Sequence, residues 1–172
     1  MICAIILILT AASAENAKAL IFAALLHEAA HILCALLFFG EFPKISAGFC
    51  GLRLYFTCRG STAEKLLLSA SGPLVNILLW LILPRGSTLA AYSLSLGIFN
   101  LIPAEGLDGG EICKALLNKL LHPAVAERIC RTMTALAVFL LFSLNCAVQL
   151  KGDFNLSLLL ITLYLIIRTY GK

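Results

Sequence analysis

Residues 17–39 have the sequence AKALIFAALLHEAAHILCALLFF, and this stretch decides how the rest of the chain is interpreted. Apolar side chains fill nearly all of it, yet its centre contains His27, Glu28 and His31. A helix rises about 1.5 Å per residue and a bilayer core is about 30 Å thick, so this length predicts a membrane-spanning helix. Ionisable side chains at membrane depth cost at least ~2.5 kcal/mol each, and their presence here indicates a functional site within the bilayer.

Similar apolar stretches recur along the chain, which has 172 residues, 61% of them hydrophobic and only 13% charged. A soluble domain carries charge on about 25% of its residues. The composition therefore predicts an all-α polytopic membrane protein, forming a single domain over residues 1–172 with no C-terminal regulatory domain. We expect about six transmembrane helices, at residues 2–14, 17–39, 66–83, 89–101, 133–148 and 154–167.

The distribution of positive charge predicts the orientation, because Lys and Arg are retained on the cytoplasmic side of a membrane. With six spans and a cytoplasmic amino terminus, ten of the 13 Lys and Arg residues fall in the cytoplasm. We therefore expect both termini to be cytoplasmic. As a separate expectation, the protein is an integral protein of a bacterial cell membrane. The net charge of +4 then indicates topology and contact with anionic membrane lipid, and not binding of nucleic acid.

One segment between the second and third spans has the pattern of a strand. Residues 52–59 alternate apolar and polar side chains between Gly51 and Gly60. Residues 45–49 could pair with them, which predicts a small membrane-associated β-hairpin on the cytoplasmic side. An amphipathic surface loop is the alternative.

The fourth span is followed by a cluster of helix breakers, namely Asn100, Pro103, Gly106, Gly109 and Gly110. A continuous helix is excluded there, so the fourth helix is expected to be broken. Unwound backbone at membrane depth is tolerated only where protein or a water-filled cavity surrounds it. The break therefore predicts a buried site.

The order His27-Glu28-Ala29-Ala30-His31 is the HExxH pattern of zinc metalloproteases. Residues four apart lie on one face of a helix, so both imidazoles can reach one zinc ion. Glu28 points in another direction, and as general base it can accept a proton from the water that attacks a carbonyl. The alternative is that the two histidines are hydrogen-bonded core residues.

Two histidines leave a catalytic zinc one protein ligand short, because such sites use three protein ligands and one open position. Asp108 is the best candidate, since it follows the break and has glycines beside it that permit close backbone approach. Glu105 and Glu111 are the competing candidates. We expect one Zn²⁺ per chain, held by His27, His31 and Asp108.

Three motifs occur in order along the chain: HExxH at 27–31, GPxxN at 72–76, and NxxP at 100–103 followed by LDG at 107–109. In these motifs the chain resembles the site-2 protease family of intramembrane zinc metalloproteases, and most closely its sporulation stage IV protease FB type. The resemblance covers about residues 17–115. A nucleotide-sensing domain that would follow in that subgroup is not expected after Lys172.

The resemblance implies intramembrane cleavage of a transmembrane or membrane-associated protein substrate, in that subgroup a sporulation sigma factor precursor. It further implies that Asn76, Pro73 and Asn100 contact the substrate and that the hairpin accepts an extended substrate by strand addition. It also leaves room for an inhibitory membrane partner.

Two other classes of protein would also carry ionisable residues in broken membrane helices. A zinc or proton transporter places histidines and carboxylates in this way, but it gives no reason for Glu28 to stand between the two histidines. An inactive relative that serves as a membrane scaffold is the third alternative.

Overall fold

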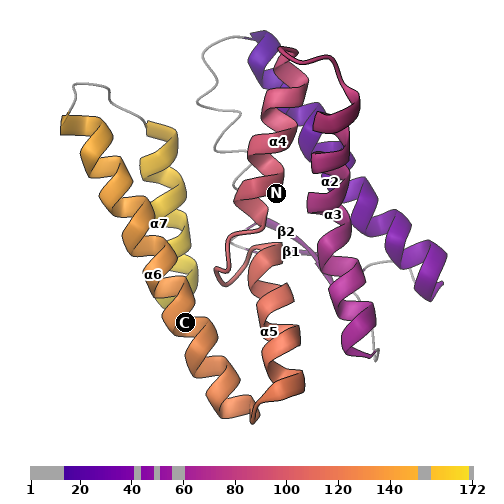
Figure 1. Ribbon diagram of the computed structural model, residues 1–172, viewed down its shortest axis with the longest axis vertical. Coiled ribbons are helices and arrows are strands. Elements are labelled where there is room, and N and C mark those ends of the chain that lie inside the picture. Colours follow the sequence, from indigo (N-terminus) through magenta and orange to yellow (C-terminus); the bar gives the residue numbers. More distant parts are fainter. Residues whose placement is uncertain (1–13, 41–43, 49–50, 56–60, 151–155, 171–172) are drawn as a thin grey trace.

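The computed structural model describes residues 14–40, 44–48, 51–55, 61–150 and 156–170. Figure 1 shows a mostly helical molecule with one pair of strands. The elements are α2 (Ala14–Phe39), β1 (Lys44–Gly48), β2 (Gly51–Tyr55), α3 (Thr62–Ile82), α4 (Thr88–Asn100), α5 (Asp108–Leu120), α6 (Pro123–Leu150) and α7 (Leu156–Tyr170).

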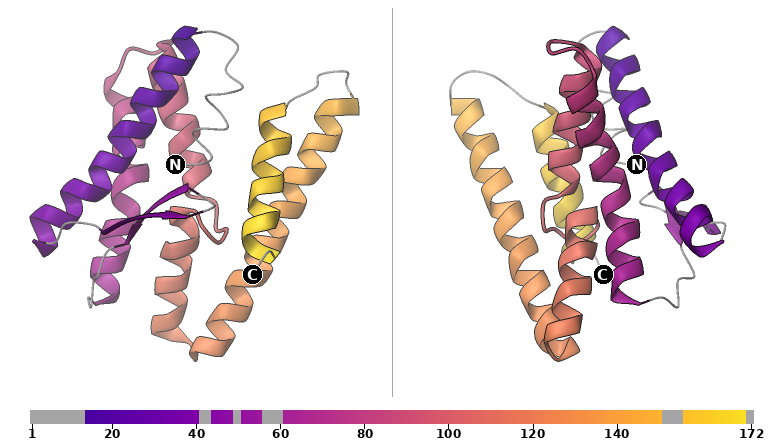
Figure 2. Two further views of the ribbon diagram at one scale, coloured as in Figure 1. Left: turned by 180° about the vertical axis from the view of Figure 1, so that it is seen from behind. Right: turned by 45° about the vertical axis from the view of Figure 1, so that its right-hand side comes forward.

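Helix α3 is the centre of the amino-terminal part, since it packs against α2, α4 and α5. Its start is set by Ser61, whose hydroxyl accepts a hydrogen bond from the backbone N–H of Glu64, and α4 is capped by Ser87 in the same way. The helix continues through Pro73, which is buried. Helices α6 and α7 pack against each other and lie to one side of α2, α3 and α4 (Figures 1 and 2).

The two parts meet at the segment that joins α4 to α5. Ala104 and Leu107 in this segment are buried against Ala137 and Val138 of α6 and Leu165 of α7. Helix α5 also contacts both α3 and α6. The residues that precede and begin α5 therefore connect the two helical groups.

The number of membrane spans differs from the sequence-based prediction. Among the described helices, three are long and apolar enough to cross a membrane, at Glu15–Phe38, Thr62–Ile82 and Pro123–Val148. Six spans are not supported, because α4 has 13 residues and α7 has 15, about 20–22 Å of helix against a core of about 30 Å. The expected first span, apart from Ala14, lies outside the described residues.

Strands β1 and β2 correspond to the expected hairpin. They pair in antiparallel fashion, with Lys44 opposite Tyr55 and Gly48 opposite Gly51. Residues 49–50 and 56–60 lie outside the described part of the chain. The views in Figures 1 and 2 place the strands at the level where α4 ends and α5 begins.

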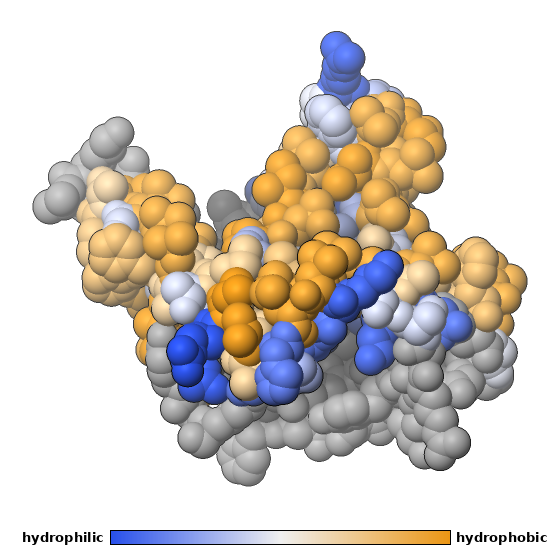
Figure 3. All heavy atoms as spheres, turned by 60° about the horizontal axis from the view of Figure 1, so that its bottom comes forward, coloured by the Kyte–Doolittle hydropathy of each residue, from blue (hydrophilic) through white to orange (hydrophobic). Residues whose placement is uncertain are grey.

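The surface of the molecule is strongly divided by polarity. Figure 3 looks toward the end where α5 meets α6, and hydrophilic side chains lie there among hydrophobic ones, while hydrophobic side chains predominate on the helices that run away from it. Large apolar side chains are exposed along α2, α3 and α6, as expected of helices that face lipid. The exposed charged residues of the polar end include Lys114, Lys119, Glu127, Arg128 and Arg131.

Candidate metal centre

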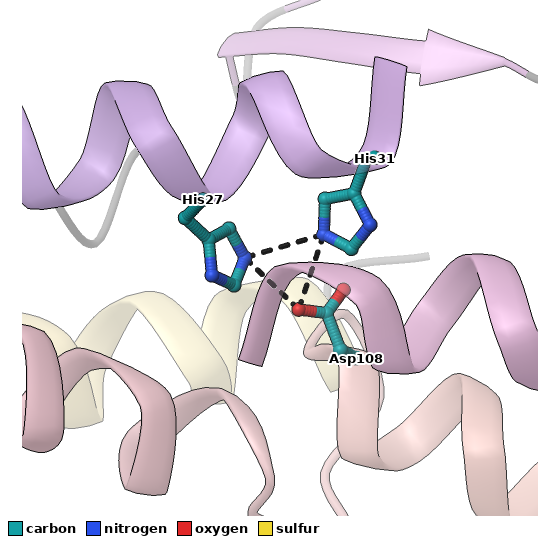
Figure 4. Close-up of side chains that lie close together, drawn as sticks. All are labelled: His27, His31 and Asp108. Carbon is teal, nitrogen blue, oxygen red and sulfur yellow. Dashed lines mark hydrogen bonds and ion pairs between the residues drawn. The ribbon is translucent and has the colours of Figure 1, made fainter. Parts of the chain in front are cut away.

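Three side chains from two separate elements converge on one point (Figure 4). His27 and His31 project from α2 with their Nε2 atoms 3.3 Å apart. Oδ2 of Asp108, at the start of α5, lies 3.0 Å from Nε2 of His27 and 3.4 Å from Nε2 of His31. Among the described residues, these three form the one group of His, Cys, Asp or Glu side chains placed to hold a metal ion.

The spacing of the three atoms fits a tetrahedral ion. Zinc bonds of ~2.0–2.1 Å at tetrahedral angles separate neighbouring ligand atoms by ~3.3 Å. Oδ2 of Asp108 is also buried and has no hydrogen-bond partner among the described residues, although a buried polar atom normally has one. A cation between the three atoms would satisfy this oxygen.

The carboxyl group of Asp108 is ionised at neutral pH. Burial raises its pKa, but a hydrogen bond from Nε2 of His27 or His31, when that nitrogen carries a proton, lowers it more strongly, to about 2. A carboxylate and two imidazole nitrogens make a donor set that suits zinc.

The ring of His31 is held by the backbone of α3. Its Nδ1 donates to the carbonyl oxygen of Leu68 at 2.8 Å, and the hydroxyl of Ser71 lies 3.1 Å from the same nitrogen. Because a carbonyl oxygen can only accept, Nδ1 carries the proton and the lone pair of Nε2 is free to bind a metal.

Helix α3 also leaves space for both rings. A Cβ atom at Gly72 would overlap Nε2 of His31 and lie 2.7 Å from Nε2 of His27. One turn further, the buried amide of Asn76 lies 3.1 Å from Nδ1 of His27. Leu68, Gly72 and Asn76 are spaced four apart, so one face of α3 matches the spacing of the two histidines.

The aspartate is positioned by backbone packing. Gly106 has a φ of +97° in the turn before α5, a conformation that glycine adopts readily. A Cβ at Gly109 would overlap the carbonyl group of Leu101, so this glycine lets the first turn of α5 approach the end of α4. The sequence placed Asp108 in the unwound stretch, whereas it is the first residue of α5.

A third element holds this segment. The backbone N–H of Glu105 donates to Oγ1 of Thr134 on α6 at 2.9 Å, and that hydroxyl donates to the carbonyl oxygen of Cys130. Thr134 is 1% exposed, so its hydrogen bond with the N–H of Glu105 is shielded from water. The position of Asp108 therefore depends on α6 as well as on α4 and α5.

Comparison with known proteins gives a family match over part of the chain and a similar fold over nearly all of it. Residues 84–144 match Peptidase family M50. The fold is similar to that of the Site-2 Protease from Methanocaldococcus jannaschii, with a TM-score of 0.64 and 23% sequence identity over 99% of this chain and 84% of that chain. The family match supports a metalloprotease, and the likeness to the solved structure shows the fold. No curated protein gives a significant sequence match.

The family match covers only one side of the candidate metal centre. It runs from the end of α3 through α5 into α6, so it includes Asp108 but neither histidine. The HExxH pattern on α2 is therefore an observation independent of that match. Glu105 and Glu111, the competing candidates for third ligand, lie outside the group of converging ligand atoms.

The other residues singled out in the sequence occupy different surroundings. Glu28 is half-buried on α2, and the amide of Asn100 donates to the carbonyl oxygen of Leu96 at 3.0 Å. Asn76 and Pro73 are fully buried. Substrate contact by Asn76, Pro73 and Asn100 stays a prediction, and Asn76 lies behind His27 instead of at an exposed surface.

The sequence had pointed to Gly72 only as the residue before a proline, and it had not pointed to Thr134 at all. A signal for Gly72 was present, because Gly72 and Asn76 repeat the four-residue spacing of His27 and His31. No comparable signal marks Thr134, whose partner Glu105 is 29 residues away in sequence.

Proposed function

We propose that this chain is an intramembrane zinc metalloprotease that holds one zinc ion through His27, His31 and Asp108. The observation that carries the proposal is the convergence of two Nε2 atoms and one buried carboxylate oxygen at separations of 3.0–3.4 Å. The HExxH pattern and the match to Peptidase family M50 support the same reaction class.

Glu28 is the proposed general base. Zinc, when bound, supplies a Lewis acid that polarises the substrate carbonyl and lowers the pKa of water. The Glu28 carboxylate accepts the proton of the attacking water and passes it to the nitrogen of the departing amine. Asp108 remains a ligand throughout and does not transfer protons.

The proposed substrate is a membrane-bound or membrane-associated protein. His27 and His31 lie within the apolar helix Glu15–Phe38, so the bond to be cleaved must enter the membrane region. A helical peptide bond has to unwind before water can reach its carbonyl. The β1–β2 hairpin supports this step in our proposal, because an extended segment can add to the outer edge of a two-stranded sheet.

Two finer parts of the proposal rest on the sequence. The positive-charge distribution supports cytoplasmic termini and a cytoplasmic hairpin. The membrane in our proposal is that of a bacterial cell. The resemblance to the sporulation stage IV protease FB type supports a sigma factor precursor as substrate. Reporter fusions after Arg59 and Lys119 test the orientation, and a non-cytoplasmic signal from either would contradict it.

The test of function separates the base from the ligand. Purified protein in detergent should contain about one zinc per chain and cleave a quenched membrane peptide. Glu28→Gln should keep the zinc while cleavage falls by at least ~10²-fold, since an amide cannot accept the proton. Asp108→Asn should lower zinc content and cleavage together, because a neutral amide is a poorer ligand than a carboxylate.

The matched control is Glu111→Gln, which neutralises an exposed carboxylate in the same first turn of α5 as Asp108. It should leave zinc content and cleavage unchanged. Loss of zinc in Glu28→Gln, or full zinc and full cleavage in Asp108→Asn, would show that the roles are assigned wrongly.

A further inference from the structure

The two histidines differ in how their outer nitrogens are held. For His31, the partner of Nδ1 is the carbonyl oxygen of Leu68, which fixes the proton on Nδ1. For His27, the partner is the side-chain amide of Asn76, whose Nδ2 faces Nδ1 at 3.1 Å. An amide can either donate or accept, so this contact alone leaves the tautomer of His27 open.

The two orientations of the amide have opposite consequences for the metal. If Nδ2 donates, Nδ1 of neutral His27 is the acceptor and Nε2 carries the proton, so Nε2 cannot bind a metal. If Oδ1 accepts, Nδ1 carries the proton and Nε2 presents its lone pair, as in His31. Histidine ligands commonly donate their second nitrogen to an oxygen in this way.

Nothing among the described residues opposes an exchange of the two amide atoms. Oδ1 of Asn76 is buried and has no hydrogen-bond partner, so no contact on its far side fixes the amide. The exchange is a half-turn about the terminal side-chain bond and leaves the heavy-atom positions almost unchanged. The Cβ of Asn76 is held independently, since it packs close to Gly97 of α4.

We propose that Asn76 is a positioning residue for His27, and that its Oδ1 accepts the Nδ1 proton and thereby directs Nε2 to the metal. One face of α3 then orients both imidazoles, with the Leu68 carbonyl on His31, the Asn76 carbonyl on His27, and Gly72 between them. This inference rests on the proposed metal site. It assigns Asn76 a role through His27 and not through the substrate.

The first experiment measures zinc affinity in Asn76→Leu, which keeps the size of the side chain but has no acceptor. Loss of an outer-shell partner lowers metal affinity by 10–100-fold, and we expect that loss here by competition with a chelator. The matched control is Ser93→Ala. It removes another fully buried polar side chain without a partner, on α4, and should bind zinc as the native chain does.

Asn76→Asp decides between the two orientations. A carboxylate can accept the Nδ1 proton but cannot donate, so this variant should recover zinc affinity to within ~10-fold of the native chain. The d–d spectrum of bound Co²⁺ should likewise match that of the native protein. If Asn76→Asp binds zinc as weakly as Asn76→Leu while remaining folded, the accepting role of Oδ1 is wrong.

A measurement on the native chain covers the case in which the variants do not fold. In zinc-loaded protein with ¹⁵N-labelled histidine and ¹³C-labelled asparagine, we expect a coupling across the hydrogen bond from Nδ1 of His27 to the side-chain carbonyl of Asn76. An Nδ1 proton that lacks this coupling and exchanges freely with water, or native zinc affinity in folded Asn76→Leu, would overturn the inference. Failure of the native chain to bind zinc would instead overturn the proposed function, so the two failures are distinguishable.

Discussion

The candidate metal centre has two halves that are built by different means. The histidine half consists of α2 and α3, where two rings four residues apart face Leu68, Gly72 and Asn76 on the neighbouring helix. The aspartate half consists of residues 101–107 with the start of α5, and it is held by close backbone packing and by Thr134 of α6.

This difference shows where each half can fail. In the histidine half, hydrogen bonds to the Nδ1 atoms set the direction of the rings. Loss of one partner should therefore weaken metal binding without moving a helix. In the aspartate half, Oδ2 of Asp108 has no such partner, and its position follows from the path of the backbone. A disturbance there must move α5 or α6 to reach the metal.

The largest effect is expected in the histidine half, from Gly72→Ala. The added Cβ would overlap Nε2 of His31 and crowd that of His27, so both ligand atoms must leave their positions. Zinc affinity should fall by at least ~100-fold, as much as or more than for loss of an outer partner. Zinc content after dialysis measures this.

Gly97→Ala is the control for Gly72→Ala, because it adds the same group to α4. Its Cβ would lie 3.3 Å from the Cβ of Asn76 and from the carbonyl oxygen of Pro73, a contact that a small shift relieves. Near-native zinc content is expected there. Full zinc in Gly72→Ala would mean that α3 is further from the rings than the structure shows.

The second largest effect is expected in the aspartate half, where Gly109→Ala adds the same group. The added Cβ would overlap the carbonyl group of Leu101, and backbone atoms cannot rotate away as a side chain can. We expect a loss of about 3 kcal/mol in stability from overpacking, with Asp108 drawn away from the histidines. Thermal unfolding in detergent, with and without zinc, measures both consequences.

Thermal unfolding of the metal-free protein distinguishes the two glycine substitutions. Gly109→Ala should unfold at a lower temperature even without zinc, whereas Gly72→Ala should act mainly through zinc binding. If Gly109→Ala lowers zinc affinity and leaves the metal-free stability unchanged, the aspartate half is not held by backbone packing.

The sequence pointed to the candidate ligands in both halves. Helical spacing alone places His27 and His31 on one face, and the helix breakers around Pro103 indicate where Asp108 approaches them. The structure brings these three side chains together. Their roles as ligands stay a prediction, as does that of Glu28.

The sequence was less informative about the number of spans and about contacts between distant segments. Six spans were predicted because the short apolar stretches at 89–101 and 154–167 were counted as spans, although the helices there, α4 and α7, have only 13 and 15 residues. Packing of α3 behind the histidines depends on how two helices are turned toward each other. The contact between Thr134 and Glu105 joins residues whose proximity no local pattern encodes.

The third effect concerns the link from α6 to the aspartate half. Thr134→Val keeps the shape of the side chain but removes the acceptor for the N–H of Glu105. An unsatisfied buried group costs about 1–3 kcal/mol, and we expect lower thermal stability with a smaller loss of zinc affinity than in Gly109→Ala. Chelator competition and unfolding in detergent measure the two quantities.

Thr132→Val is a close control, since Thr132 is on the same helix but exposed, and its hydroxyl bonds only to the carbonyl oxygen of Arg128. Little change is expected there. Equal stability losses in Thr132→Val and Thr134→Val would show that α6 does not hold the segment before Asp108.

The smallest effect is expected from Ser71→Ala in the histidine half. The hydroxyl of Ser71 lies 3.1 Å from Nδ1 of His31, but that nitrogen also donates to the carbonyl oxygen of Leu68 at 2.8 Å. Because the carbonyl remains, zinc affinity should fall by less than the ~10-fold that marks loss of an outer partner. Chelator competition measures the change, with Ser69→Ala on the same helix as the control. A loss as large as that of Asn76→Leu would mean that the hydroxyl, and not the backbone of α3, holds His31, and the two rings would then both depend on single side chains.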